Sequence, residues 1–376
     1  MKDQNHIHAN TASVAKLSPQ VARSMANFAG SLANEDFYLS SYAAVNNIRD
    51  QVYQSIADLL ACDPTNLSLH SSTSAALAKA VLSLPASRRK HIAFSAACYA
   101  SAKALAKVLI QHGSSVTYVG RDTGYVGIDD LDAMTDLPDV LVLEWVNHRC
   151  GCVSPLDLIS RWCRENDILL VVDAVQALGA VPLVFDTDRI DFMAGAAHKW
   201  LGGPEGIVFL YSAPEHIHTL NPILPGYASL KTSGQSNQSP MFHGNGRILE
   251  TGTLSSISLV GFAAAMAELQ EFGYHQRLLK IGYLHQRIIE VLRQYPAIQL
   301  MEEPLSDGPS GIISFVVLGI DTDVLVNQLA VCGVTAKNRD GVVRLSPSHD
   351  IDGDALTARL TLALDQFFAA ERPAYV

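Results

Sequence analysis

Hydrophobic positions alternate between two patterns through the first two thirds of the chain. Amphipathic or alanine-rich stretches of helical periodicity alternate with short, β-branched apolar runs bounded by turn residues. The predicted helices cover residues 18–29, 45–61, 74–84, 100–112 and 156–165. The predicted strands cover residues 91–94, 115–119, 140–145, 168–173, 191–194 and 207–211. Because most of these strands are continuously apolar, the pattern predicts an α/β fold with a largely parallel sheet that is buried on both faces.

The pattern changes after this region. Residues 222–246 are rich in Gly, Ser, Asn and Gln, which predicts a long loop. Beyond it the sequence predicts helices at 258–272, 274–294 and 355–370, with strands at 312–317 and 342–345. This tail fits a second, smaller α+β domain. We therefore predict a large domain over residues 16–255, with residues 1–15 and 256–376 forming the small domain.

Composition excludes several classes of protein. The 376 residues include 27 Lys and Arg against 37 Asp and Glu, a net charge of −10, which gives no electrostatic reason to bind nucleic acid. No apolar run reaches the roughly 18 residues that span a bilayer, and the N-terminus has no apolar secretory stretch. The six cysteines form no C-x-x-C pair, so we expect reduced thiols and no metal. Cys150 and Cys152 are interpreted as core packing. A cytoplasmic protein is expected.

Two charged residues carry the chemistry. The common dinucleotide, P-loop, hydrolase and zincin motifs are missing from the sequence. Asp173 ends a predicted buried strand, and Lys199 follows another, at the sheet edge where α/β proteins bind ligands. Burying both charges is costly unless a group lies between them. Pyridoxal phosphate is such a group, since a carboxylate keeps its ring nitrogen protonated and a lysine forms its Schiff base. Each residue alone also has an ordinary interpretation, as a helix cap or a solvated lysine.

The segment DAVQALG, followed 26 residues after Asp173 (199 − 173) by the lysine of AAHKWLGGPEG, resembles the class V aminotransferase and cysteine desulfurase family. These are fold-type I pyridoxal phosphate enzymes, and the resemblance extends over most of the chain. It implies a mostly parallel seven-stranded sheet in the large domain. It also implies Lys199 as the lysine of the cofactor aldimine, Asp173 as the partner of the ring nitrogen and Gln176 as a donor to the phenolic oxygen. His198 would lie near the phosphate.

Three further segments match family motifs. SSTSAALAKAVLSLP, which begins with Ser71, Ser72 and Thr73, predicts a helix N-terminus. This end is either an anion site or an ordinary helix cap. The resemblance implies the anion site, because Thr73 aligns with the phosphate-binding threonine of the family. ETGTLSSISLVG resembles the E-x-G-T motif, which implies that Thr253 reaches the phosphate of the other subunit of a homodimer. RLSPSHDIDGDAL resembles the segment that binds the substrate carboxylate, so Arg344 is the candidate clamp, with a surface salt bridge as the alternative.

The chain also departs from the family. Tyr99 stands where desulfurases have a histidine over the ring, and it can still stack. His148 aligns with the usual asparagine beside the phenolic oxygen, but Asn147 is adjacent, and which of the two faces the cofactor is open. Ala196 replaces a phosphate-binding serine. No cysteine precedes Arg344 on a loop, and Cys332 falls where a helix should end, which disfavours a persulfide-forming desulfurase.

Within the family, NHRCGCVSP and RLSPSHDID look closest to the branch of hercynylcysteine sulfoxide lyase and isopenicillin N epimerase. The resemblance therefore implies an L-amino acid or a derivative of one as substrate. We expect C–S β-elimination of a cysteine-derived compound first, and class V amino transfer or epimerisation second. A catalytically silent binding protein of the same fold is the remaining alternative, because a fold does not fix a function.

Overall fold

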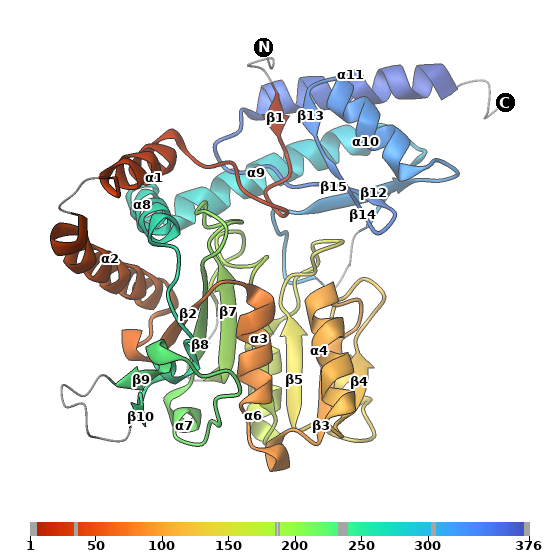
Figure 1. Cartoon of the computed structure of the whole chain (residues 1–376). Helices are drawn as coiled ribbons and strands as arrows, with labels where there is room; N and C mark the ends of the chain where they lie inside the picture. The colour runs from red at the N-terminus through yellow and green to blue at the C-terminus, as the bar shows by residue number, and fades with distance from the viewer. Residues whose placement is uncertain are drawn as a thin grey trace.

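The structure is a computed structural model that describes residues 6–33, 37–184, 186, 189–231, 240–301 and 306–371. Figure 1 shows two sheets, one above the other. The larger sheet has seven strands in the order β2-β8-β7-β6-β5-β3-β4. Its strands are β2 (Leu67–His70), β3 (His91–Ser95), β4 (Ser115–Val119), β5 (Val140–Glu144), β6 (Leu169–Asp173), β7 (Phe192–Ala196) and β8 (Val208–Ser212). Only β8 runs antiparallel to its neighbours, β2 and β7. The predicted mostly parallel, seven-stranded α/β sheet is confirmed.

Helices cover both faces of this sheet. On one face lie α3 (Thr73–Leu82) and α4 (Ala100–Gln111), and on the other α2 (Phe37–Leu60), α6 (Leu156–Glu165) and α8 (Ser256–Phe272). Successive strand residues enter opposite cores: Val171 packs with α3 and α4, whereas Val172 packs with α6 and α8. This two-sided burial explains why the strands are continuously apolar. The other helices of this part of the chain are α1 (Pro19–Ser31), α5 (Ile128–Asp132), α7 (Pro214–Ile217), η1 (Pro64–Asn66) and η2 (Ala86–Arg88).

The smaller sheet is antiparallel, in the order β11-β12-β15-β14. Its strands are β11 (Ile298–Leu300), β12 (Ile313–Val317), β14 (Lys337–Arg339) and β15 (Val342–Leu345), and its helices are α9 (Tyr274–Leu292), α10 (Thr322–Val331) and α11 (Gly353–Glu371). Near the N-terminus, β1 (Ile7–His8) pairs with β13 (Val334–Thr335), so the start of the chain joins this unit (Figure 1).

Helix α8 bears on the expected division of the chain. Its buried side chains, among them Phe262 and Met266, lie in the same core as the large sheet. In contrast, Ile288 and Leu292 of α9 pack with the small sheet. The expected boundary before residue 256 stays a prediction, and the packing of α8 favours a boundary between α8 and α9.

Part of the expected loop at 222–246, residues 232–239, lies outside the described residues. The rest contains η4 (Tyr227–Ser229) and a short hairpin of β9 (Leu230–Lys231) and β10 (Met241–Phe242), and η5 (Gly246–Leu249) begins at its end. The segment is therefore more regular than its composition suggested, since two strands and two turns of helix interrupt it.

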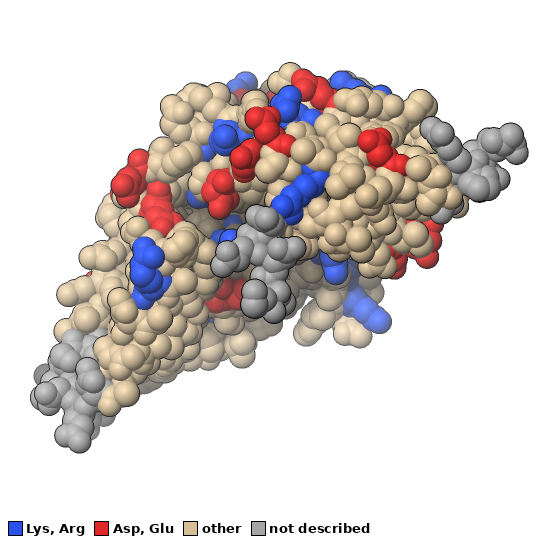
Figure 2. Space-filling view, turned by 90° about the horizontal axis from the view of Figure 1, so that it is seen from above, with Lys and Arg blue, Asp and Glu red and all other residues tan. Residues whose placement is uncertain are grey.

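Charge is mixed over the face that carries the small domain. Figure 2 shows Lys and Arg interspersed with Asp and Glu there, without the basic stripe that phosphate backbones require. No helix in the described ranges is long and apolar enough to cross a membrane. The expected cytoplasmic location stays a prediction.

Candidate active site

The candidate residues gather at the carboxyl ends of the parallel strands. The ring of Tyr99, which follows β3, is the point where they meet. The ring of His148 lies edge-on to it with 5.0 Å between centroids, and the Nζ atom of Lys199 lies 5.9 Å from the centroid of Tyr99. Three segments separated by up to 100 residues in sequence thus converge, because parallel strands end at one edge of the sheet.

Asp173 is the last residue of β6. Its Oδ1 accepts a 3.1 Å hydrogen bond from the backbone N–H of Val175. Burial first, and then the charge of Glu144, its register neighbour on β5, raise the pKa of Asp173 to about 6. A carboxyl group in this setting favours a partner that brings a proton or a positive charge.

Lys199 lies in the turn that follows β7. Burial lowers its pKa to about 8, and the nearby charge of Asp173 opposes this shift. A fraction of the amine is therefore neutral near pH 7, as a nucleophile requires. The adjacent His198 also has a lowered pKa, first because of burial and then because of Lys199. Its Nδ1 is buried and has no hydrogen-bond partner within the described ranges.

His148 and Asn147 have different surroundings. Nδ1 of His148 lies 2.9 Å from Oε1 of Glu144, which fixes the imidazole beside Tyr99. The amide nitrogen of Asn147 donates to the carbonyl oxygen of Ala97 and to Glu144, and its Oδ1 accepts from the next backbone N–H groups. Of the two alternatives that the sequence left open, the geometry favours His148 as the side chain facing the site.

Gln176 already has partners on both sides of its amide. Nε2 donates to the carbonyl oxygen of Ala12 at 2.9 Å, and Oε1 accepts from the indole of Trp200 at 2.9 Å. Its implied bond to the cofactor would therefore use the second Nε2 hydrogen. That assignment stays a prediction.

Arg344 on β15 is fully buried, which excludes the surface salt bridge that was the alternative. Its Nη1 donates to the carbonyl oxygen of His148 at 2.6 Å and its Nη2 to Oγ of Ser13 at 2.7 Å. Burial lowers its pKa to about 10, and Nε has no partner among the described residues. In the described part of the chain, the hydrogen-bond partners of this guanidinium are neutral, and an anionic ligand would neutralise its charge.

Three residues of this region were missed by sequence reasoning. Arg339 on β14 places its Cζ 5.5 Å from the centroid of Tyr99, and its Nε is buried without a partner in the described ranges. Glu144 holds His148, and Ser13 holds Arg344. Only Glu144 left a sequence signal, as an acid that ends the apolar run VLVLE.

The segments that we expect to bind the phosphate have the local structure that the sequence predicted at α3, and their role stays a prediction. Ser72 caps α3, with Oγ accepting from the N–H of Ala75 at 3.2 Å, and Thr73 is the first residue of the helix. Thr253 is exposed, with its hydroxyl 2.6 Å from that of Tyr227. Ala196 is buried at the end of β7, and Cys332 caps the end of α10 as expected.

Among the described residues, one cluster outside this site has the spacing of metal ligands, formed by Asp191, Glu215 and His216. Nε2 of His216 lies 2.5 Å from Oδ1 of Asp191, and its ring stacks on Phe192. Arg88, Arg164 and Arg189 line the same hollow and oppose a cation there.

The family model for aminotransferase class-V matches residues 8–366. The chain belongs to this family. It is 30% identical over 184 residues to the cysteine desulfurase IscS of Neisseria meningitidis serogroup C (strain 053442), which covers 47% of the chain and 41% of that protein. It is 29% identical over 283 residues to a probable mitochondrial cysteine desulfurase of Schizosaccharomyces pombe, 72% of the chain and 51% of that protein. The matched part thus spans about half or less of these relatives.

Solved structures of the same fold extend over nearly the whole class-V chain. A C-DES mutant with glycine covalently linked to the PLP cofactor has a TM-score of 0.86 at 18% identity, covering 96% of this chain and 97% of that one. The apo cysteine desulfurase of Thermococcus onnurineus NA1 has a TM-score of 0.84 at 17% identity, covering 97% and 95%. At these identities the likeness shows the fold, that of fold-type I enzymes.

Proposed function

We propose that this class-V protein is a pyridoxal phosphate enzyme that cleaves the C–S bond of a cysteine-derived amino acid by β-elimination. The observation that carries the proposal is the pair Asp173 and Lys199, partly buried at the ends of adjacent strands, with pKa values shifted toward each other, to about 6 and about 8. Buried groups with perturbed pKa values mark functional sites. The relatives named above are cysteine desulfurases, and one structural neighbour is a cystine C–S lyase in complex with its reaction product cysteine persulfide.

The residues present fit the cofactor. Asp173 would hold the protonated ring nitrogen, which accounts for a carboxyl group whose pKa is raised by burial. Nδ1 of His198, buried and without a partner in the described ranges, and the N-terminus of α3 at Thr73 would hold the phosphate. The cofactor, once bound, supplies an electron sink for the bond being broken at Cα.

The chain's own groups then perform three tasks. Arg344 would bind the substrate carboxylate through the hydrogen-bonding capacity left on its guanidinium. Lys199, as the neutral amine, takes the proton from the substrate Cα, and the Cβ–S bond then breaks. Tyr99 would stack on the cofactor ring. Arg339, whose Cζ lies 5.5 Å from the centroid of Tyr99, would add a positive charge for a second anionic group of the substrate.

The positions of the cysteines favour β-elimination without a persulfide on the protein. Within the described residues, the strand segment before Arg344 holds no cysteine. Cys332 ends α10, where its Sγ lies 3.4 Å from Oε1 of Gln366. A desulfurase passes sulfur to a reactive thiolate, and the described segment that leads to Arg344 offers none. Amino transfer stays the second candidate, because the family model carries that name.

We further propose a homodimer whose partner subunit completes the phosphate site through Thr253. This threonine is exposed beside Tyr227, and Leu224, Met241 and Phe242 of the same region are also exposed. Exposed apolar side chains gathered in one region are typical of a protein interface.

A substrate panel tests the function. The purified protein with pyridoxal phosphate is given cystine, S-alkylcysteines, cysteine sulfoxides and ordinary L-amino acids, and keto acid and ammonia are assayed. We expect catalytic pyruvate and ammonia from the sulfur compounds, and none with Lys199→Ala. Stoichiometric keto acid with conversion of the cofactor to its pyridoxamine form would instead make it an aminotransferase.

A further inference from the structure

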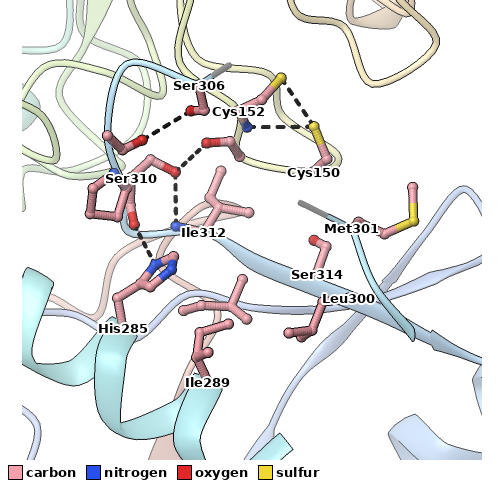
Figure 3. Close-up of a pocket in the computed structure, with 14 residues that line it drawn as sticks. Cys150, Cys152, His285, Ile289, Leu300, Met301, Ser306, Ser310, Ile312 and Ser314 are labelled. Atoms are coloured by element: carbon pink, nitrogen blue, oxygen red, sulfur yellow. Dashed lines mark hydrogen bonds between the residues drawn. The ribbon is translucent and has the colours of Figure 1, made fainter. Parts of the chain in front are cut away.

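A second pocket lies between the turn that follows β5 and the small domain (Figure 3). It has a volume of about 420 Å³ and is lined by Cys150–Cys152, by His285 and Ile289 of α9, and by residues of β12 and the segment before it. None of the residues assigned above to the cofactor or the substrate lines this pocket. Cys150 and Cys152 lie at its edge with their sulfur atoms facing each other.

The two thiols are already close to bonding distance. Their Sγ atoms are 3.2 Å apart, and a disulfide of about 2.05 Å requires them to approach by only about 1.2 Å. Both thiols also point at one acceptor, the carbonyl oxygen of Thr123, at 2.7 Å from Cys150 and 3.1 Å from Cys152. One carbonyl oxygen, which has two lone pairs, thus holds both thiols side by side.

The backbone holds the thiols in this arrangement. Gly151 between them has φ +80°, and a Cβ there would lie 2.7 Å from Ile312. Its N–H donates to the carbonyl oxygen of Asn147 at 2.9 Å, and its own carbonyl oxygen accepts from Oγ of Ser310 at 2.7 Å. The N–H of Asn147 in turn donates to Cys152. This closed turn fixes the position of both cysteines.

The electrostatics distinguish this pair from the other thiols. The hydrogen bond from Cys152 lowers the pKa of Cys150, against the effect of burial. By contrast, burial raises the pKa of Cys62 to about 12 and that of Cys98 to about 11. The thiolate is the nucleophile in thiol chemistry, so Cys150 is the most readily activated of these three.

We propose that Cys150 and Cys152 form a thiol–disulfide exchange site that reacts with small organic disulfides admitted by the pocket. The thiolate of Cys150 attacks one sulfur of the disulfide RSSR, and one RS⁻ leaves. Cys152, deprotonated by that leaving group, attacks the sulfur of Cys150, and the second RS⁻ leaves and takes up the proton that Cys150 lost. The two protein thiols lose two electrons, and RSSR is reduced to two RSH.

Mass analysis of one tryptic peptide tests this. The reduced protein is incubated with 2-hydroxyethyl disulfide, denatured in the presence of N-ethylmaleimide, which alkylates free thiols, and digested with trypsin. Cleavage after Arg149 and Arg161 releases CGCVSPLDLISR, which contains these two cysteines and no other. We expect this peptide to carry no maleimide and to be two hydrogen atoms lighter than its reduced form. Dithiothreitol treatment before alkylation should restore two maleimide groups, and Cys163 should be alkylated in both samples.

Two variants sharpen the result. Cys152→Ser removes the thiol that displaces the second RS⁻, so the mixed disulfide on Cys150 should persist. Cys332→Ser is the control: it removes a more accessible thiol and should leave formation of the Cys150–Cys152 disulfide unchanged. The proposal is wrong if both cysteines of the wild-type peptide remain alkylated after oxidation. It is equally wrong if each keeps its own hydroxyethylthio group. Wild-type protein decides these outcomes even if the Cys152→Ser variant does not fold.

Discussion

At the scale of single residues, Asp173 and Lys199 are coupled through their charges. Each is shifted by burial away from its ionised form, and each is partly restored by the other. A protonated ring nitrogen beside Asp173 would remove the repulsion from Glu144. The proposed cofactor would therefore supply the positive charge that stabilises the ionised form of Asp173.

Replacing the carboxylate tests its role. Asp173→Asn keeps the shape but cannot hold a proton on the ring nitrogen, so kcat/KM for elimination should fall by at least about 100-fold. Cofactor binding should remain measurable by absorbance. Asp157→Asn, which removes an ion pair with Arg161 on α6, is the matched control and should change kcat/KM little. Equal activity of both variants would remove Asp173 from the mechanism.

The pKa of Lys199 predicts a pH dependence. Its amine is a nucleophile only when neutral, and burial has lowered its pKa to about 8. The rate at which cofactor-free protein takes up pyridoxal phosphate should therefore rise with pH up to about 8 and level off above it. Stopped-flow absorbance measures this rate. A rise that continues to about 10.5, the pKa of an ordinary lysine, would contradict the assignment.

Arg339 gives a third prediction. If Arg339 binds a second anionic group of the substrate, Arg339→Gln should raise KM about tenfold for substrates with two carboxylates. This corresponds to a loss of about 1.4 kcal/mol of binding free energy. Substrates with one carboxylate should show little change. Arg161→Gln on the surface is the control. A similar rise for both substrate classes would assign Arg339 to the cofactor instead.

The sequence predicted the site residues that lie in recognisable motifs. It did not predict the residues that enter the site only through tertiary packing. Asp173 and Lys199 follow buried strands, so their position at the sheet edge could be read from the pattern. Arg339 could not, since β14 is three residues long and its sequence is polar. Ser13 comes from the far end of the chain, and nothing in the local sequence shows that it meets Arg344.

At the scale of elements, the apolar runs predicted six of the seven strands in the large sheet. β2 was missed because LSLH alternates polar and apolar residues over only four positions. Both polar side chains are nevertheless buried, with Oγ of Ser68 2.9 Å from Nε2 of His70. Hydrogen bonding between neighbours on one face thus lets a polar sequence form a buried strand.

The turn after β5 depends on Gly151. Gly151→Ala would force a Cβ against Ile312 at a positive φ, so the free energy of unfolding should fall by about 2 kcal/mol or more. Gly282→Ala is the matched control, because this glycine lies within α9 with open space around it. Gly282→Ala should raise the free energy of unfolding by about 0.5–1 kcal/mol. Urea unfolding measures both, and equal effects would show that the turn is not under this constraint.

At the scale of the whole molecule, the N-terminal segment and the two sheets together build the site. Residues near position 12 bind Gln176, and the segment continues to His198, whose carbonyl oxygen accepts from Ala15 at 2.8 Å. The site therefore combines groups from the start, the middle and the end of the chain. Such a combination follows from topology and is not visible in any one stretch of sequence.

The proposed dimer is tested at this scale. Phe242→Asp places a charge among the exposed apolar side chains near Thr253, so it should shift the protein toward monomer and weaken cofactor retention. Val331→Asp, on an 80% exposed position of α10, is the control and should change neither property. Sedimentation velocity with absorbance detection follows both. A wild-type monomer that is fully loaded with cofactor would rule out the shared site.

The most direct test of the central claim is to locate the cofactor on the chain. Purified protein is mixed with pyridoxal phosphate, reduced with borohydride, digested and analysed by mass spectrometry. We predict one pyridoxyl group per chain, attached at Lys199, and none in Lys199→Ala. A pyridoxyl group at another lysine, or none at all, would contradict the account.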